Sequence, residues 1–215
     1  GFVLFALAPV IFPRSPYIGF VIATIIYSGS GGLSELLLSP IVNAIPTDEK
    51  VSAMSFLHAS YSWGHVVVVL VTTLFLHFFS RTAWPYVVLL WAILPLINMF
   101  MFIRVPLAPG VPKEHRQGMK ALILNRFFII FFLIIAAGGA AEVSITQWAS
   151  SFMEKGIQLP KIFGDIAGVC GFALMMGIGR TMLGKIGSRL DISKIMLAGA
   201  IIVACCFLII AFSPF

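Results

Sequence analysis

Residues 25–46 read IIYSGSGGLSELLLSPIVNAIP, an apolar stretch that carries the carboxylate of Glu35 with no basic residue nearby in the sequence. A helix needs about 20 mostly apolar residues to cross the hydrocarbon core of a bilayer. A charge at the centre of such a helix costs about 2.5–3.5 kcal/mol on insertion scales, so it usually faces a bundle interior or a water-filled cavity. The stretch therefore predicts a membrane helix whose acid points inward, and Pro40 is expected to break that helix just below the acid.

The composition extends this interpretation to the whole chain. Hydrophobic residues make up 60% of the 215 residues and charged residues 10%, against roughly 45–50% and about 25% in soluble domains. Seven apolar runs follow one another, from Gly1 to Phe12, Tyr17 to Pro46, Val51 to Phe79, Tyr86 to Val105, Ala121 to Phe152, Phe163 to Ile186 and Ile195 to Phe212. The first run is too short to cross a membrane alone. Because there is no initiator methionine and no polar tail, we expect a piece of a longer protein.

The basic residues predict the orientation of the spans. Ten of the fourteen follow the second, fourth and sixth runs, namely Lys50, Arg104, Lys113, Arg116, Lys120, Arg126, Arg180, Lys185, Arg189 and Lys194. Lys and Arg accumulate in short cytoplasmic loops, so these connections are expected in the cytoplasm. The net charge of +6 is then a signal of topology, and nucleic-acid binding is not expected.

Cysteine and histidine spacing gives no sign of a metal centre or a cofactor. Cys170, Cys205 and Cys206 all lie inside apolar runs, where they are expected to pack as small side chains. The four histidines form no ligand pattern with them. We therefore expect no cofactor, no metal and no enzymatic activity, and an intramembrane enzyme is the least favoured alternative.

An internal repeat links two acids. The GGLSE of residues 31–35 recurs as GGAAE at residues 138–142, and each acid lies ten or eleven residues before the end of its run. At about 1.5 Å per residue, Glu35 and Glu142 both fall near the middle of the bilayer, on helices that run in opposite directions. Secondary transporters are often built from such inverted repeats, with substrate and ion sites at the midplane.

Each of these acids is a candidate proton carrier. A carboxyl group held away from water favours its neutral form, and an acid that ionises when it opens to water can carry a proton. We therefore interpret Glu35 and Glu142 as proton-coupling residues, with H⁺ as the coupling ion. The alternative is a permanently protonated Glu that hydrogen-bonds to a neighbouring helix.

Other polar residues inside the runs are candidates for contact with a substrate. His58 and Tyr61 share one helical face by their i, i+3 spacing, and imidazole, hydroxyl and aromatic groups suit a polyhydroxylated ligand. Asn43, Gln147 and Trp148 are further candidates. Packing or a position at the membrane interface is the alternative for each.

The stretch from 106 to 120 predicts a boundary between two bundles. Prolines and a glycine precede its basic part, which indicates a linker. We therefore divide the chain into residues 1–105, the remainder of one helical bundle, a cytoplasmic linker over 106–120, and residues 121–215, the start of a second bundle.

Residues 31–64, GGLSELLLSPIVNAIPTDEKVSAMSFLHASYSWG, resemble the fourth and fifth helices of the fucose:proton symporter-like sugar transporters of the major facilitator superfamily. Matching positions are Gly32, Glu35, Pro40, Lys50, His58, Tyr61 and Gly64, whereas Ser39 departs from the usual Asn. The resemblance implies an all-α membrane protein with the major facilitator superfamily fold. The chain would cover about helices 3 to 9 of 12, as a partial bundle of about seven transmembrane segments. It also implies that Glu35 couples protons and that His58 and Tyr61 approach the substrate.

Residues 179–191, GRTMLGKIGSRLD, resemble the cytoplasmic signature between the second and third helices of each half of this superfamily. Arg180, Lys185 and Arg189 match its basic positions, while Gly184 stands where the first-half copy has Asp. The resemblance implies a gating loop. The alternative is an ordinary basic cytoplasmic loop.

The favoured function is a secondary active transporter that moves a small polar solute, expected to be a sugar, by proton-coupled alternating access. We expect a multi-pass protein of a bacterial plasma membrane, surrounded by lipid and functional as a monomer when full length. A drug or lipid exporter of the same superfamily and a seven-helix membrane receptor are the alternatives.

Overall fold

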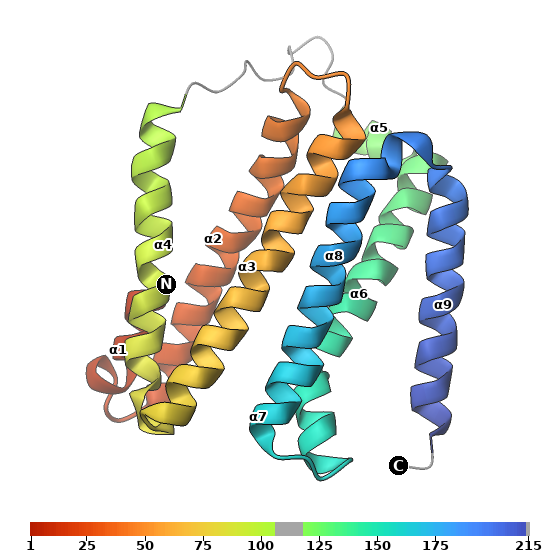
Figure 1. Cartoon of the computed structure of the whole chain (residues 1–215). Coiled ribbons are helices and arrows are strands. Elements are labelled where there is room, and N and C mark those ends of the chain that lie inside the picture. The colour runs from red at the N-terminus through yellow and green to blue at the C-terminus, as the bar shows by residue number, and fades with distance from the viewer. Residues whose placement is uncertain (106–117, 214–215) are drawn as a thin grey trace. The chain divides into compact units, whose positions relative to one another are not determined.

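The computed structural model describes residues 1–105 and 118–213, apart from the side chain of Ser188. Over these residues the chain is helical and contains no strand (Figure 1). Six helical segments are long and apolar enough to cross a membrane, namely Pro16–Asn43, Lys50–Phe78, Arg81–Arg104, Arg126–Lys155, Lys161–Ile186 and Ile192–Phe212. The first helix, α1 (Phe2–Ile11), is too short. The expected all-α membrane fold, with a first segment that cannot cross alone, is confirmed.

The spans correspond to single helices or to short series of helical segments. Single helices are α2 (Pro16–Asn43), α3 (Lys50–Phe78), α6 (Arg126–Lys155) and α9 (Ile192–Phe212). The third span begins with the 3₁₀ turn η1 (Arg81–Ala83), which leads into α4 (Trp84–Arg104). The fifth span consists of α7 (Lys161–Phe163), the π-helical η3 (Gly164–Cys170) and α8 (Gly171–Ile186). Short segments are α5 (Met119–Ile123) and η4 (Gly187–Arg189).

Side-chain caps explain where two of the spans begin. The Asn125 side chain accepts a hydrogen bond from the Phe127 N–H at 2.9 Å, and Asp191 accepts from the Ser193 N–H at 3.1 Å. Such caps satisfy backbone donors that have no partner inside the helix. The predicted run from Ala121 to Phe152 is therefore two helices, α5 and α6, because Asn125 starts a new helix.

The expected break at Pro40 is wrong. The helix α2 continues through Pro40 to Asn43. A proline removes the hydrogen bond of its own nitrogen, but its carbonyl still accepts from the Ala44 N–H at 3.0 Å. Pro40 thus lies in the last turn of α2, and the helix ends three residues beyond it.

The chain forms two compact units, each considered by itself. The first comprises Gly1–Pro46 and Leu70–Gly110, and the second Thr47–Val69 and Val111–Phe215, so that the division passes through α3. The predicted division at a linker over 106–120 falls mostly on residues outside the described part of the chain, and it stays a prediction.

An aromatic cluster holds the first unit together. The Phe5 ring of α1 lies 5.0 Å from that of Phe20 in α2 and 5.9 Å from that of Trp84 in α4. Trp91 also donates its indole N–H to the Thr72 hydroxyl at 3.0 Å. These contacts dock the short α1 against α2 and α4, although α1 cannot cross the membrane alone.

In the second unit the first half of α3 lies beside α8 (Figure 1). The Ser52 hydroxyl donates to the Gly184 carbonyl at 2.6 Å, and the Trp63 indole N–H donates to the Thr181 hydroxyl at 3.1 Å. A Cβ added at Gly184 would lie 3.2 Å from the Phe56 ring. The absence of a side chain at Gly184 therefore lets α3 approach α8.

Near the C-terminal end of α6, polar contacts join this helix to the fifth span. The Ser150 hydroxyl donates to the Asp165 carboxylate. Lys161 lies 3.4 Å from Asp165 and 3.9 Å from Glu154. These contacts fix the turn between α6 and η3.

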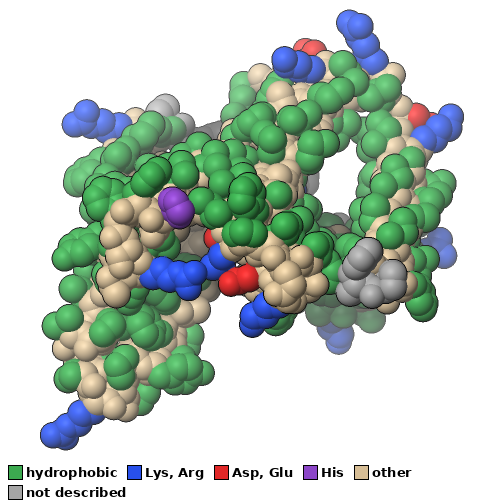
Figure 2. All heavy atoms as spheres, turned by 60° about the horizontal axis from the view of Figure 1, so that its bottom comes forward, with side chains coloured by type: hydrophobic (Ala, Val, Ile, Leu, Met, Phe, Trp, Pro, Cys, Tyr) green, Lys and Arg blue, Asp and Glu red, His purple; other side chains and the backbone are tan. Residues whose placement is uncertain are grey.

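Most large apolar side chains are exposed on the helices. Examples are Ile135, which is 74% exposed, and Phe212, which is 82% exposed. Figure 2 shows hydrophobic side chains over most of the face in view, with few charged side chains among them. Such surfaces suit contact with lipid tails or with further helices rather than with water.

Candidate functional site

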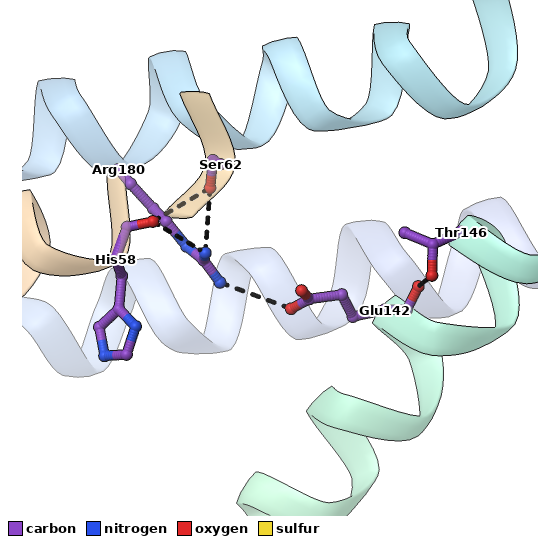
Figure 3. Close-up of polar contacts among 5 residues, drawn as sticks. All are labelled: His58, Ser62, Glu142, Thr146 and Arg180. Atoms are coloured by element: carbon purple, nitrogen blue, oxygen red, sulfur yellow. Dashed lines mark hydrogen bonds and ion pairs between the residues drawn. The ribbon is translucent and has the colours of Figure 1, made fainter. Parts of the chain in front are cut away.

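Arg180 lies at the centre of a polar cluster formed by three helices of the second unit (Figure 3). Its Nη2 lies 3.4 Å from Oε2 of Glu142. Its Nη1 donates to the main-chain carbonyl of His58 at 3.2 Å and to the Ser62 hydroxyl at 3.0 Å. One guanidinium on α8 therefore joins α6 to α3.

Helical spacing places the two acceptors of α3, the His58 carbonyl and the Ser62 hydroxyl, next to each other. Ser62 lies one turn after His58 and donates its hydroxyl to the His58 carbonyl at 3.1 Å. Ser62 is fully buried, so its oxygen has no water to bond and instead accepts from Arg180. The Arg180 guanidinium also lies 6.0 Å from the centre of the Tyr61 ring, which is at the limit of a cation–π contact.

On α6, hydrogen bonds within the helix surround Glu142. The Thr146 hydroxyl donates to the main-chain carbonyls of Glu142 at 3.0 Å and Val143 at 3.1 Å. These bonds satisfy the hydroxyl without using the Glu142 carboxylate. That carboxylate is therefore left to face Arg180.

The ion pair is half-buried inside two predicted membrane spans. The side chains of Arg180 and Glu142 are 28% and 30% exposed. Ionisable residues at membrane depth usually pair with one another or with backbone carbonyls, and Arg180 does both. Because the charges offset each other, the cluster can hold two ionisable groups away from bulk water.

An open cavity of about 480 Å³ lies next to this cluster. Its polar walls come from Lys50, Ser55, His58 and Arg180. Aliphatic side chains complete the lining, namely Val51, Met54 and Leu183. The His58 imidazole extends away from the guanidinium (Figure 3), so His58 contacts Arg180 through its main-chain carbonyl.

His65 continues the polar face of α3 beyond Tyr61. Its ring lies 6.2 Å from that of Tyr61, and its Nδ1 is buried with no hydrogen-bond partner among the described residues. Most buried polar atoms in proteins have a partner. The Nδ1 atom of His65 is therefore an exception to this rule among the described residues.

The structure brings only some of the predicted site residues together. Glu142, His58 and Tyr61 meet at Arg180, whereas Gln147 and Trp148 are exposed further along α6. Glu35 and Asn43 are both exposed on α2 in the first unit. Lys185 and Arg189 are exposed at the end of α8 and in η4.

The expected position of Arg180 and Lys185 in a connecting loop is wrong, because α8 continues to Ile186. The sequence itself indicates that Arg180 belongs to a helix, since Arg180 lies inside the apolar run that ends at Ile186. A basic residue within a span needs a partner. Sequence reasoning sought partners for the acids but did not connect Glu142 with Arg180.

Among the described residues, no group of three or more His, Cys, Asp and Glu side chains could hold a metal ion. The polar groups found at the site are one ion pair, hydroxyl groups and imidazoles. Such groups can bind polar solutes, and a carboxylate can accept a proton.

Six apolar spans with an ion pair held between their helices define a multi-pass integral membrane protein. The family model of the Major Facilitator Superfamily matches residues 1–215, and the chain belongs to this superfamily. It is a membrane transporter of the superfamily, which moves small-molecule solutes and works in a lipid environment. This assignment sets aside the seven-helix receptor.

Comparison with curated proteins and with solved structures gave no match. The narrower resemblance to fucose:proton symporter-like transporters therefore stays a prediction.

Proposed function

We propose that the protein is a secondary active transporter that takes up a small polar solute, a sugar, by proton-coupled alternating access. The observation that carries this proposal is the position of Arg180, which joins Glu142 on α6 to His58 and Ser62 on α3. Ionisable networks at membrane depth are rare and usually mark solute or proton pathways. By resemblance, the protein would act as a monomer in a bacterial plasma membrane.

Protonation of Glu142 gives the cluster a way to change state. A proton on the carboxylate removes the negative charge that attracts the Arg180 guanidinium, while the neutral acceptors on α3 remain. The contact between α6 and α8 then weakens, whereas the contact between α3 and α8 is kept. Proton binding would in this way change which helices move together.

Glu35 is the second acid of the proposal. Among the described residues it forms no ion pair, in contrast to Glu142. An acid without a fixed cation can release its proton to whichever side is open to water. We therefore assign proton coupling to Glu35 first and to Glu142 second.

Substrate contacts are assigned to the polar face of α3. His58 is one of the residues that line the cavity, Tyr61 is 58% exposed, and His65 has a buried nitrogen without a partner among the described residues. These groups supply donors, acceptors and an aromatic face, as a sugar requires. Asn43, Gln147 and Trp148 remain candidates on their own helices.

The test is transport by the full protein in sealed vesicles. Glu35→Gln keeps the size of the side chain but cannot exchange a proton, so it should abolish uptake driven by a proton gradient while exchange of solute across the membrane continues. Glu154→Gln is the control, because Glu154 is a partly exposed acid near the end of α6. Wild-type, pH-independent uptake in Glu35→Gln would remove Glu35 from the coupling role.

A further inference from the structure

The fifth span changes its helical type partway along its length. It begins with α7, passes through the π-helical η3 and continues as α8 (Figure 1). A π-helical turn is rare, and it often lies at a functional site or at a kink of a longer helix. The span therefore consists of two pieces, α7 with η3 and then α8, which meet at Gly171.

The first piece is held to α6. The Ser150 hydroxyl of α6 donates to the Asp165 carboxylate of η3. Lys161 of α7 lies 3.4 Å from Asp165 and 3.9 Å from Glu154 of α6. A Cβ added at Gly164 would lie only 2.9 Å from the Ser150 carbonyl oxygen. Polar contacts and a close approach of the two backbones therefore fix α7 and η3 on α6.

The second piece is hydrogen-bonded to α3 instead. The Trp63 indole N–H of α3 donates to the Thr181 hydroxyl of α8 at 3.1 Å. The Ser52 hydroxyl of α3 donates to the Gly184 carbonyl of α8 at 2.6 Å. Because these bonds join α8 to α3, a displacement of the first half of α3 would carry α8 with it.

A single polar link ties α8 to α6. Among the described residues, the contact between Arg180 and Glu142 is the only hydrogen bond or ion pair between these two helices. Its length of 3.4 Å is long for a charge-assisted hydrogen bond. The same guanidinium also donates to Ser62 of α3 at 3.0 Å. Loss of the contact with Glu142 would thus leave α8 attached to α3 but not to α6.

We propose that η3 is a hinge, at which α8 bends away from α6 together with α3 when the contact between Arg180 and Glu142 is lost. The pieces on either side of the hinge are anchored to different helices, so the change must occur between them. A π turn can exchange bonds of the i→i+5 and i→i+4 types, so its backbone groups stay paired as a bilayer requires. A few residues at the joint can therefore absorb the whole change of dihedral angles.

Distances between pairs of spin labels test the hinge in the full protein, in nanodiscs and in a cysteine-free background. One pair joins Lys155 of α6 to Met182 of α8, and the other joins Ile135 of α6 to Phe163 of α7; all four side chains are exposed. Met182 lies about 16 Å along α8 from Gly171 at about 1.5 Å per residue, so a kink of about 20° moves it by about 6 Å. Glu142→Gln should therefore change the first distance and leave the second unchanged.

Two substitutions of glycine by alanine test the position of the bend. A Cβ at Gly171 would lie 3.7 Å from the Ile166 carbonyl oxygen, an ordinary contact, and a Cβ at Gly179 meets nothing within 4 Å. Both substitutions therefore fit, and both restrict the backbone. Combined with Glu142→Gln, Gly171→Ala at the joint should reduce the change in the first distance to less than half. Gly179→Ala, the matched control within α8, should leave it in full.

The same measurements can overturn the proposal. An unchanged distance between Lys155 and Met182 would show that the ion pair does not hold the hinge. Equal changes in both pairs would mean that the fifth span moves as one rigid helix, and equal effects of the two alanine substitutions would exclude a bend at η3. Glu142→Asp, which draws the carboxylate back from Arg180, should give a smaller change in the same distance and serves if Glu142→Gln does not fold.

The hinge goes beyond the proposed function and is tested apart from it. These distances require neither a proton gradient nor a sugar. Uptake that ignores a proton gradient would refute the proposed coupling and leave the hinge in place, whereas a rigid fifth span would refute the hinge alone.

Discussion

At the scale of the residue, the site depends on the geometry of Arg180. Its side chain reaches a carboxylate on one helix and two neutral oxygens on another. The sequence shows that Arg180 and Glu142 both lie inside apolar runs, and the cost of an isolated charge there predicts that each has a partner. It does not show which partner, because the two residues lie 38 positions apart in the sequence, on different spans.

A double-mutant cycle measures the Glu142 and Arg180 pair. Glu142→Gln and Arg180→Gln should each lower the free energy of unfolding by about 1–3 kcal/mol, because each leaves a half-buried charge without its partner. The loss of free energy of unfolding in the double variant should be smaller than the sum of the two single losses by at least about 0.5 kcal/mol. Chemical denaturation in detergent measures all three values.

Glu154 and Lys161 provide the control cycle. Their side chains are 38% and 44% exposed and lie 3.9 Å apart. Exposed pairs contribute little to stability, so the coupling energy of this pair should be near zero. If the effects of the Glu142 and Arg180 substitutions on the free energy of unfolding were also strictly additive, the contact between these residues would contribute nothing to stability.

At the scale of the element, close approach between α3 and α8 places the oxygens of α3 within reach of Arg180. Gly184 makes that approach possible, since the Phe56 ring occupies the space where a Cβ would stand. The sequence predicted the spans, because periodicity and length determine helices in a membrane. It missed the start of α6 at Arg126, because an apolar run does not reveal that an Asn within it acts as a cap.

Gly184→Val tests this approach. The added side chain would collide with Phe56, and overpacking of this kind costs about 1–3 kcal/mol. We therefore expect a lower unfolding temperature and, because α3 moves away from Arg180, reduced transport. Gly179→Val on the same helix is the control, because a Cβ there meets nothing within 4 Å. Equal effects of the two substitutions would show that helix propensity, and not the approach to α3, decides the outcome.

At the scale of the whole molecule, the distribution of positive charge determines how the spans lie in the membrane. Lys185 lies at the end of the fifth span, Arg189 follows that span, and Lys155 ends the fourth. The positive-inside rule places the first two in the cytoplasm and Lys155 outside. Orientation is therefore a property of the loops and is independent of the contacts at Arg180.

Cysteine labelling tests this orientation. In a background with Cys170, Cys205 and Cys206 changed to Ser, Lys155→Cys should react with a membrane-impermeant maleimide in intact cells. Lys185→Cys should react only after the cells are permeabilised. Both side chains are exposed, so lack of reaction reports sidedness rather than burial. The reverse pattern would invert the predicted topology.

By itself the sequence determined that this chain is an all-α membrane protein built from successive apolar spans, and its family follows from the same linear pattern. Apolar length is enough for that, because every backbone polar group in a bilayer must be satisfied within its own helix. Only the tertiary structure decided that Arg180 joins Glu142 to α3 next to an open cavity. Such contacts depend on how helices distant in sequence pack side by side, and no local pattern of residues fixes that packing.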